Sequence, residues 1–146
     1  MQGIGGNQVN LFQLGSFVLS SGKESSFKIE CDALTDDDVK TLAEMIRTMV
    51  GSYSSVEGVP TGGLRLATEL EKHKSLNGPH LIVDDVLTTG GSMEKAVKEH
   101  KTRTASEHGD YEPFVGAVVF ARGQRPHWIK AVFQMPECFW LKPRTR

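Results

Sequence analysis

Residues 81–92 read Leu-Ile-Val-Asp-Asp-Val-Leu-Thr-Thr-Gly-Gly-Ser, and this stretch decides the fold. The three apolar residues at 81–83 predict a strand buried on both faces. The glycines at 90 and 91 predict a tight turn after the two aspartates. Apolar residues recur at helical spacing from Met93, so the turn is expected to lead into a helix. A buried strand, a glycine turn and a helix form the unit from which parallel α/β sheets are built.

The same order occurs earlier in the chain. Residues 54–59 predict a short strand, residues 60–63 (Pro-Thr-Gly-Gly) predict a turn, and apolar residues from Leu64 predict a second helix. Two more strands, 115–120 and 128–133, are predicted with a short turn between them. Strands that alternate with helices predict an α/β, three-layer fold with a central, mostly parallel sheet. Ligands bind such sheets outside the carboxyl ends of the strands, where both glycine turns are expected.

One further helix is predicted nearer the N-terminus. Thr35 is a favourable helix cap, and the three aspartates at 36–38 complement the positive end of the helix dipole. Apolar residues recur at helical spacing over 39–50, and Gly51 ends the pattern. Before this helix, residues 11–30 alternate loosely between apolar and polar residues. They predict short extended pieces that form a small hood at the edge of the domain.

The length of 146 residues predicts one domain, which we expect to span residues 11–146. Residues 1–10 are rich in glycine and glutamine and are expected to be flexible. They lack the positive start and the apolar stretch of a signal peptide, which favours a cytoplasmic protein. No apolar run approaches the roughly 18 residues that a membrane span needs, so no membrane partner is expected.

Charge and cysteine content exclude further classes of protein. The chain has 17 Lys plus Arg and 18 Asp plus Glu, so it has no overall positive field that would hold a nucleic acid. Its two cysteines, Cys31 and Cys138, do not have the spacing of metal ligands. They are expected to be reduced thiols.

The turn after the central strand has the chemistry of a phosphate site. Gly90 and Gly91 allow the backbone N–H groups of residues 88–92 to face one point, and the dipole of the following helix favours an anion there. Three side chains add hydroxyl donors: Thr88, Thr89 and Ser92. This stretch is neither a Walker loop nor a GxGxxG dinucleotide motif, because the residues required at fixed positions are absent.

Asp84 and Asp85 suit a different part of the same ligand. Carboxylates repel a phosphate, but at the end of a strand they can accept hydrogen bonds from two sugar hydroxyls or hold a hydrated Mg²⁺. With the phosphate turn they predict a ribose 5-phosphate site. The alternative is an ordinary strand, turn and helix in which the two acids are solvated and Ser92 caps the helix.

Residues 81–93 resemble the phosphoribosyl pyrophosphate motif of the type I phosphoribosyltransferases. These enzymes have a parallel sheet with flanking helices and transfer ribose 5-phosphate from phosphoribosyl pyrophosphate to a nucleobase nitrogen, with Mg²⁺ as cofactor. The resemblance implies that Asp84 and Asp85 are the catalytic and metal-binding pair and contact the ribose hydroxyls. It also implies five residues that hold the 5-phosphate: Thr88, Thr89, Gly90, Gly91 and Ser92.

Two segments are closest to the orotate phosphoribosyltransferases within this family. Residues 14–25 (Leu-Gly-Ser-Phe-Val-Leu-Ser-Ser-Gly-Lys-Glu-Ser) resemble their N-terminal segment, and residues 56–67 resemble their pyrophosphate loop. The implied pyrophosphate-binding residues are Pro60, Thr61, Gly62 and Gly63. The implied base-binding residues are Lys23, Phe27, Thr88 and Arg122, of which the arginine suits a planar carboxylate.

One segment departs from the orotate enzymes. Between the second helix and the central strand, those enzymes carry an extra strand and a mobile loop rich in Lys and Arg. This chain has only residues 71–80 there. Ten residues form a turn more readily than a strand and a catalytic lid. The basic residues 72–74 do not follow the order of the family's loop, so no catalytic role is transferred to them.

The sequence therefore predicts a transferase that uses phosphoribosyl pyrophosphate and Mg²⁺ with a nucleobase, most readily orotate, in pyrimidine nucleotide synthesis. The resemblance also implies a homodimer. Two alternatives remain open. One is a module that binds phosphoribosyl pyrophosphate or a nucleotide without turnover, which the short 71–80 connection favours. The other is a type I transferase for another base, such as a purine.

Overall fold

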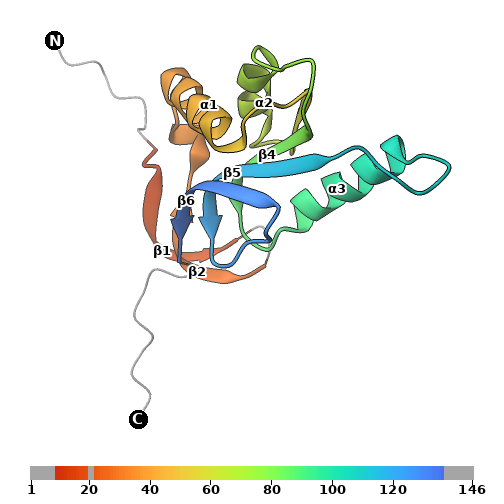
Figure 1. The fold of residues 1–146 in the computed structure, drawn as a ribbon. Coiled ribbons are helices and arrows are strands. Elements are labelled where there is room, and N and C mark those ends of the chain that lie inside the picture. The colour runs from red at the N-terminus through yellow and green to blue at the C-terminus, as the bar shows by residue number, and fades with distance from the viewer. Residues whose placement is uncertain (1–8, 20–21, 137–146) are drawn as a thin grey trace.

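The computed structural model describes residues 9–19 and 22–136 (Figure 1). Their elements are β1 (Phe12–Val18), β2 (Glu24–Ile29), the 3-10 turn η1 (Cys31–Ala33), α1 (Asp36–Val50), β3 (Ser55–Gly58), α2 (Leu64–Glu71), β4 (His80–Leu87), α3 (Gly91–Thr104), β5 (Phe114–Arg122) and β6 (Ile129–Met135). Strands β3 to β6 form a parallel sheet in the order β3-β4-β5-β6, and β1 pairs with β2 in a separate antiparallel hairpin. The predicted α/β fold with a small N-terminal hood is confirmed.

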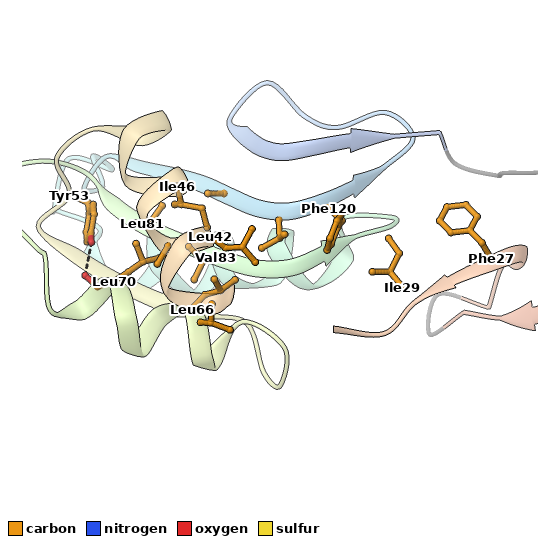
Figure 2. Close-up of a cluster of buried hydrophobic side chains, with 14 residues drawn as sticks. Phe27, Ile29, Leu42, Ile46, Tyr53, Leu66, Leu70, Leu81, Val83 and Phe120 are labelled. Atoms are coloured by element: carbon orange, nitrogen blue, oxygen red, sulfur yellow. Dashed lines mark hydrogen bonds between the residues drawn. The ribbon is translucent and has the colours of Figure 1, made fainter. Parts of the chain in front are cut away.

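Helices cover both faces of the parallel sheet. Alternate residues of β4 point to opposite faces, as a strand requires. Leu81 and Val83 join the core beneath α1 and α2, whereas Ile82 joins a second core beneath α3. Figure 2 shows the first core, where the buried Tyr53 donates a hydrogen bond to the carbonyl oxygen of Leu70 at 2.5 Å. The strand is buried on both sides, which explains its uninterrupted apolar sequence.

Helix α1 begins and ends where the sequence predicts. The hydroxyl of Thr35 accepts a hydrogen bond from the backbone N–H of Asp38 at 3.1 Å, and the Asp38 carboxylate accepts one from the N–H of Thr35 at 2.9 Å. This reciprocal pair is a capping box, which satisfies two N–H groups at the helix start. Gly51 follows the helix with φ of 75°, a conformation that glycine adopts without strain.

The central strand is longer than its apolar run. Asp84 and Asp85 lie inside β4, which pairs with β5 as far as Leu87. The strand predicted at 81–83 is too short, because the pairing with β5 outweighs the low strand preference of aspartate. Helix α3 likewise begins two residues before Met93, at Gly91.

The last two strands are parallel although few residues join them. Gly116 pairs with Ile129, and Arg122 pairs with Met135, so residues 123–128 return the chain along the whole strand. Six extended residues span about 20 Å, which is sufficient for this return. A Cβ at Gly116 would lie 2.6 Å from the Trp128 ring, so this glycine makes room for the tryptophan that precedes β6.

The hairpin of β1 and β2, which we call the hood, packs at the carboxyl end of β5. Phe27 and Ile29 belong to the same core as Phe120, and the rings of Phe12 and Phe120 meet edge to face at 5.6 Å. Figure 1 shows the hood at the opposite side of the molecule from α2. The hood therefore forms a wall beside the edge of the sheet where ligands are expected.

Some predictions lie outside the described residues. They include most of the flexible segment, at residues 1–8, and Cys138. The predicted domain limits of 1–10 and 11–146 stay predictions. No helix in the described ranges is long and apolar enough to cross a membrane.

Candidate active site

A cavity of about 850 Å³ opens at the carboxyl end of the parallel sheet. One side is formed by the loop after β3, another by the turn between β4 and α3, and a third by the hood and η1. Loops at the carboxyl ends of neighbouring parallel strands meet at one edge of a sheet, so the two glycine turns converge there. The cavity is lined by ten of the residues predicted from the sequence: Pro60, Gly62, Asp84, Asp85, Thr88, Thr89, Gly90, Gly91, Ser92 and Arg122.

The two aspartates extend from the floor of this cavity. The Asp84 carboxylate accepts a hydrogen bond from the backbone N–H of Asp85 at 2.8 Å, and the Asp85 carboxylate accepts one from the N–H of Val86 at 2.7 Å. Burial, a hydrogen bond to Asp85 and the charge of Asp85 together raise the pKa of Asp84 to about 8. Two carboxyl groups held this close favour a proton or a cation between them.

The glycines after β3 let the first loop approach the aspartates. A Cβ at Gly62 would overlap the carboxylate of Asp85. A Cβ at Gly63 would lie 2.7 Å from the backbone nitrogen of Val59 and would overlap the carbonyl of Val83. The loop is tied to β4 by the bond from the Val59 N–H to the Val83 carbonyl, at 2.8 Å. A side chain at Gly63 would separate the loop from the strand that carries the acids, and a side chain at Gly62 would displace the Asp85 carboxylate.

The turn after β4 has the form of an anion site. Gly90 has φ of 84° and precedes the first residue of α3, so the chain reverses without a steric penalty. Gly91 and Ser92 form the first turn of the helix, where backbone N–H groups have no partner within the helix. Their N–H groups and the helix dipole favour a phosphate in the adjoining cavity.

Arg122 connects the hood to the parallel sheet. It is the last residue of β5, is only 3% exposed, and lines the cavity. Its guanidinium lies 3.7 Å from the centre of the Phe27 ring and donates hydrogen bonds to the Phe27 carbonyl at 3.1 Å and to the Ser25 hydroxyl. A desolvated cation over an aromatic ring contributes about 2 kcal/mol. Arg122 therefore holds the hood in place beside the cavity.

Four predicted residues do not line the cavity. Thr61 and Gly63 belong to the first loop but are not among the lining residues, although Gly63 is required for the loop to dock. Phe27 is buried beneath Arg122, and Lys23 is exposed near the turn of the hood. A base contact by Lys23 or Phe27 stays a prediction.

Sequence reasoning missed residues of the cavity wall. Those with polar or ionisable side chains are Lys28, Glu30, Cys31 and Asp32 from the hood and η1, and Lys95 from α3. A signal existed for Lys95, because it lies four residues after Gly91 on the same helical face. No local signal existed for the others, since only packing brings η1 to the aspartates. Burial, with the charge of Asp85, raises the pKa of the Cys31 thiol, so this cysteine is a neutral wall residue.

The raised pKa of Asp84 predicts how the stability of the ligand-free protein depends on pH. The unfolded chain loses this proton near the ordinary value of 3.8, whereas the folded chain retains it up to about pH 8. Between these values unfolding releases a proton, so the free energy of unfolding falls as the pH rises. Above about pH 8 both states are ionised and the loss is complete.

Thermal unfolding at pH 5 and pH 8 measures this effect. We expect Asp84→Asn to lose less stability than the unchanged protein between the two pH values. The control Asp110→Asn, at an exposed position in the loop before β5, should follow the unchanged protein. Equal losses in all three proteins would show that Asp84 ionises normally.

Comparison with known proteins assigns the chain to a family. No protein-family model matches it. Orotate phosphoribosyltransferase from Pyrococcus abyssi is 32% identical over 127 residues, covering 66% of this chain and 67% of that protein. The chain belongs to the orotate phosphoribosyltransferase family. The Methanocaldococcus jannaschii relative of the same name is 29% identical, covering 63% of this chain and 68% of its own length. The chain thus spans about two thirds of these relatives.

Solved structures of the orotate phosphoribosyltransferase family share the fold. The Aeropyrum pernix orotate phosphoribosyltransferase superposes with a TM-score of 0.64 at 25% identity, covering 85% of this chain and 88% of that one. The UMP synthase of Leishmania donovani superposes with a TM-score of 0.63 at 16% identity, and the match covers 33% of that longer chain. At this identity the second likeness concerns the fold alone.

The short connection between α2 and β4 lies far from the cavity of this orotate phosphoribosyltransferase family member. The Ser75 N–H bonds to the Tyr53 carbonyl at 2.8 Å, and the Ser54 hydroxyl bonds to the Gly78 carbonyl at 2.8 Å. These contacts hold the connection beside the residues before β3, at the amino end of the sheet. The ammonium groups of Lys72 and Lys74 pair with carboxylates of α2. The described structure therefore brings none of these cations to the cavity.

Proposed function

We propose that this protein transfers ribose 5-phosphate from phosphoribosyl pyrophosphate to orotate and releases pyrophosphate. The observation that carries the proposal is the convergence of two aspartates and two glycine turns on one cavity at the carboxyl ends of β3 and β4. The membership in the orotate phosphoribosyltransferase family supports orotate as the base. The product is a pyrimidine nucleotide, so the reaction belongs to pyrimidine nucleotide synthesis.

Each part of the cavity suits one part of the donor. The N–H groups and hydroxyls of residues 88–92 suit the 5-phosphate, and the loop 60–63 suits the pyrophosphate. Asp84 and Asp85 accept hydrogen bonds from the ribose hydroxyls. The bond from C1 of the ribose to the pyrophosphate oxygen breaks, and a bond from C1 to the base nitrogen forms. The carboxylates also stabilise the positive charge that develops on the ribose as pyrophosphate leaves.

Magnesium is proposed as the cofactor, and the donor set of the cavity fits it. Asp84 and Asp85 offer carboxylate oxygens, whereas the described residues contain no cluster of three or more metal-ligating side chains. Mg²⁺ commonly binds one or two carboxylates and completes its shell with substrate phosphates and water. When bound, it supplies positive charge to the leaving pyrophosphate.

The proposal is tested by adding phosphoribosyl pyrophosphate, Mg²⁺ and orotate to the purified chain. We expect orotate absorbance to fall as one pyrophosphate is released for each orotate consumed. Heat of donor binding without consumption of any base would contradict the enzyme and support a binding module. Consumption of a purine in place of orotate would contradict the pyrimidine assignment.

The binding module is retained as a second candidate because of one observation. The short connection between α2 and β4 lies at the amino end of the sheet, so it does not cover the cavity. A departing pyrophosphate acquires negative charge, and a site without covering cations stabilises this charge less. Turnover with any base would eliminate this candidate.

Arg122 is proposed to bind the carboxylate of the base. We expect Arg122→Ala to raise the KM for orotate about tenfold or more, since a charge-assisted hydrogen bond contributes about 1.5–3 kcal/mol. The KM for phosphoribosyl pyrophosphate should change much less. Steady-state kinetics with each substrate varied in turn measure both values. Equal loss for donor and base would mean that the substitution displaces the hood instead.

Three further expectations stay predictions. A homodimer is supported by exposed apolar side chains on β1, including Leu14 at 80% and Val18 at 74% exposure, which a second copy could cover. Sedimentation velocity measures this state. The cytoplasmic location and the lack of a nucleic-acid or membrane partner rest on the sequence alone.

A further inference from the structure

Acidic side chains outnumber basic ones in the cavity. Four carboxylates line it, from Glu30, Asp32, Asp84 and Asp85, and a phosphoribosyl ligand adds the charge of its 5-phosphate. The N–H groups of a turn and the dipole of a helix offset part of that charge. A side-chain cation beside the phosphate would offset more. The structure shows which cation of this chain is available.

Three cations of the described chain line the cavity, and two of them are engaged. Arg122 donates to the hood and stacks on Phe27. The ammonium of Lys28 lies 3.0 Å from the carboxylate of Glu30. Lys95, by contrast, forms no ion pair and no hydrogen bond with any residue that the structure describes. It is exposed and lines the cavity.

The position of Lys95 on α3 directs it to the phosphate turn. Helix α3 begins at Gly91, so Lys95 lies one helical turn after the first residue. Helical side chains tilt toward the N-terminus of their helix, and residues i and i+4 lie on one face. The lysine side chain therefore leans back over Gly91, at the end of the helix that faces the cavity. The pyrophosphate loop follows a different strand, β3, so the nearer group is the 5-phosphate.

We propose, on the basis of the function proposed above, that Lys95 binds the 5-phosphate of the ligand together with the turn at 88–92. Both the donor and the nucleotide product carry this phosphate unchanged, so Lys95 stabilises the ground state and the transition state equally. An interaction of this kind lowers KM without raising kcat. Lys95 is thus a binding residue and takes no part in the bond changes at C1.

The test is a calorimetric titration of ribose 5-phosphate into the ligand-free protein. We expect Lys95→Gln to weaken binding about tenfold, as the loss of one charge-assisted contact to a phosphate would do. Lys95→Arg should restore most of the affinity. The matched control is Lys98→Gln, which removes the same charge from an exposed position on α3 outside the cavity. This control should bind ribose 5-phosphate as the unchanged protein does.

Kinetics provide the second readout. The KM for phosphoribosyl pyrophosphate should rise about tenfold in Lys95→Gln while kcat stays within about twofold. Equal affinity of Lys95→Gln and the unchanged protein for ribose 5-phosphate would overturn the role of Lys95 and leave the proposed transferase standing. Weaker binding in Lys95→Gln without orotate turnover in any protein would support Lys95 and overturn the transferase. A fall in kcat alone would also contradict the inference.

Discussion

Replacing Asp84 and Asp85 together by asparagine is expected to abolish binding of phosphoribosyl pyrophosphate while the protein remains folded. Each charged hydrogen bond to a ribose hydroxyl contributes about 1.5–3 kcal/mol, so the affinity should fall at least about 100-fold. The asparagine side chains also lack the negative charge with which the carboxylates would hold Mg²⁺. Calorimetric titration of the donor with Mg²⁺ measures the affinity.

The fold should survive because both side chains lie at the cavity and outside the two hydrophobic cores. Removal of the two carboxyl groups even relieves the burial and the repulsion that raise the pKa of Asp84. Circular dichroism and thermal unfolding check this point. A matched control, Asp37→Asn with Asp110→Asn, makes the same two substitutions at exposed positions. Unchanged donor affinity in the site variant, or equal loss in the control, would refute the assigned site.

Replacing Gly63 by alanine is expected to destabilise the protein strongly. The new Cβ would lie 2.7 Å from the Val59 nitrogen and would overlap the Val83 carbonyl, and both are backbone atoms that cannot rotate away. The loop must then separate from β4. Overpacking of this kind costs about 3 kcal/mol, which lowers the Tm of a domain of this size by about 9 °C.

The control for this prediction is Gly91→Ala. A Cβ at Gly91 would meet its nearest atom, the Thr89 hydroxyl, at 3.8 Å, which is ordinary contact. Alanine also favours a helix by about 0.5–1 kcal/mol over glycine, so this variant should unfold at the same or a higher temperature. Differential scanning calorimetry compares the two proteins. A Gly63→Ala variant as stable as Gly91→Ala would show that the loop does not press against β4.

Features that depend on neighbours in the sequence were predictable. The limits of α1 follow from the Thr35 and Asp38 capping pair and from Gly51. The phosphate turn follows from consecutive glycines and hydroxyl residues between a buried strand and a helix. Both features arise from interactions over a few residues, which the order of amino acids specifies directly. The acidic pair could be predicted for the same reason.

The exact end of β4 and the direction of β6 were decided by pairing between strands. Asp84 and Asp85 continue the strand because β5 lies beside them, which no preference of aspartate predicts. The short turn after β5 would equally suit an antiparallel hairpin, and only the register of Gly116 with Ile129 shows that the chain returns to form a parallel pair. Strand preference depends on context, so these outcomes could not be derived locally.

The sequence by itself therefore determined the chemical groups of the site: two carboxylates, two glycine turns and an arginine at the end of a strand. The tertiary structure alone decided how they meet. It placed Gly62 against Asp85 and bonded Arg122 to Phe27 of the hood, which lies 95 residues earlier in the chain. It also placed the short connection after α2 at the amino end of the sheet, away from the cavity. These contacts join residues distant in the chain, and they form only when burial of the shared cores brings the elements together.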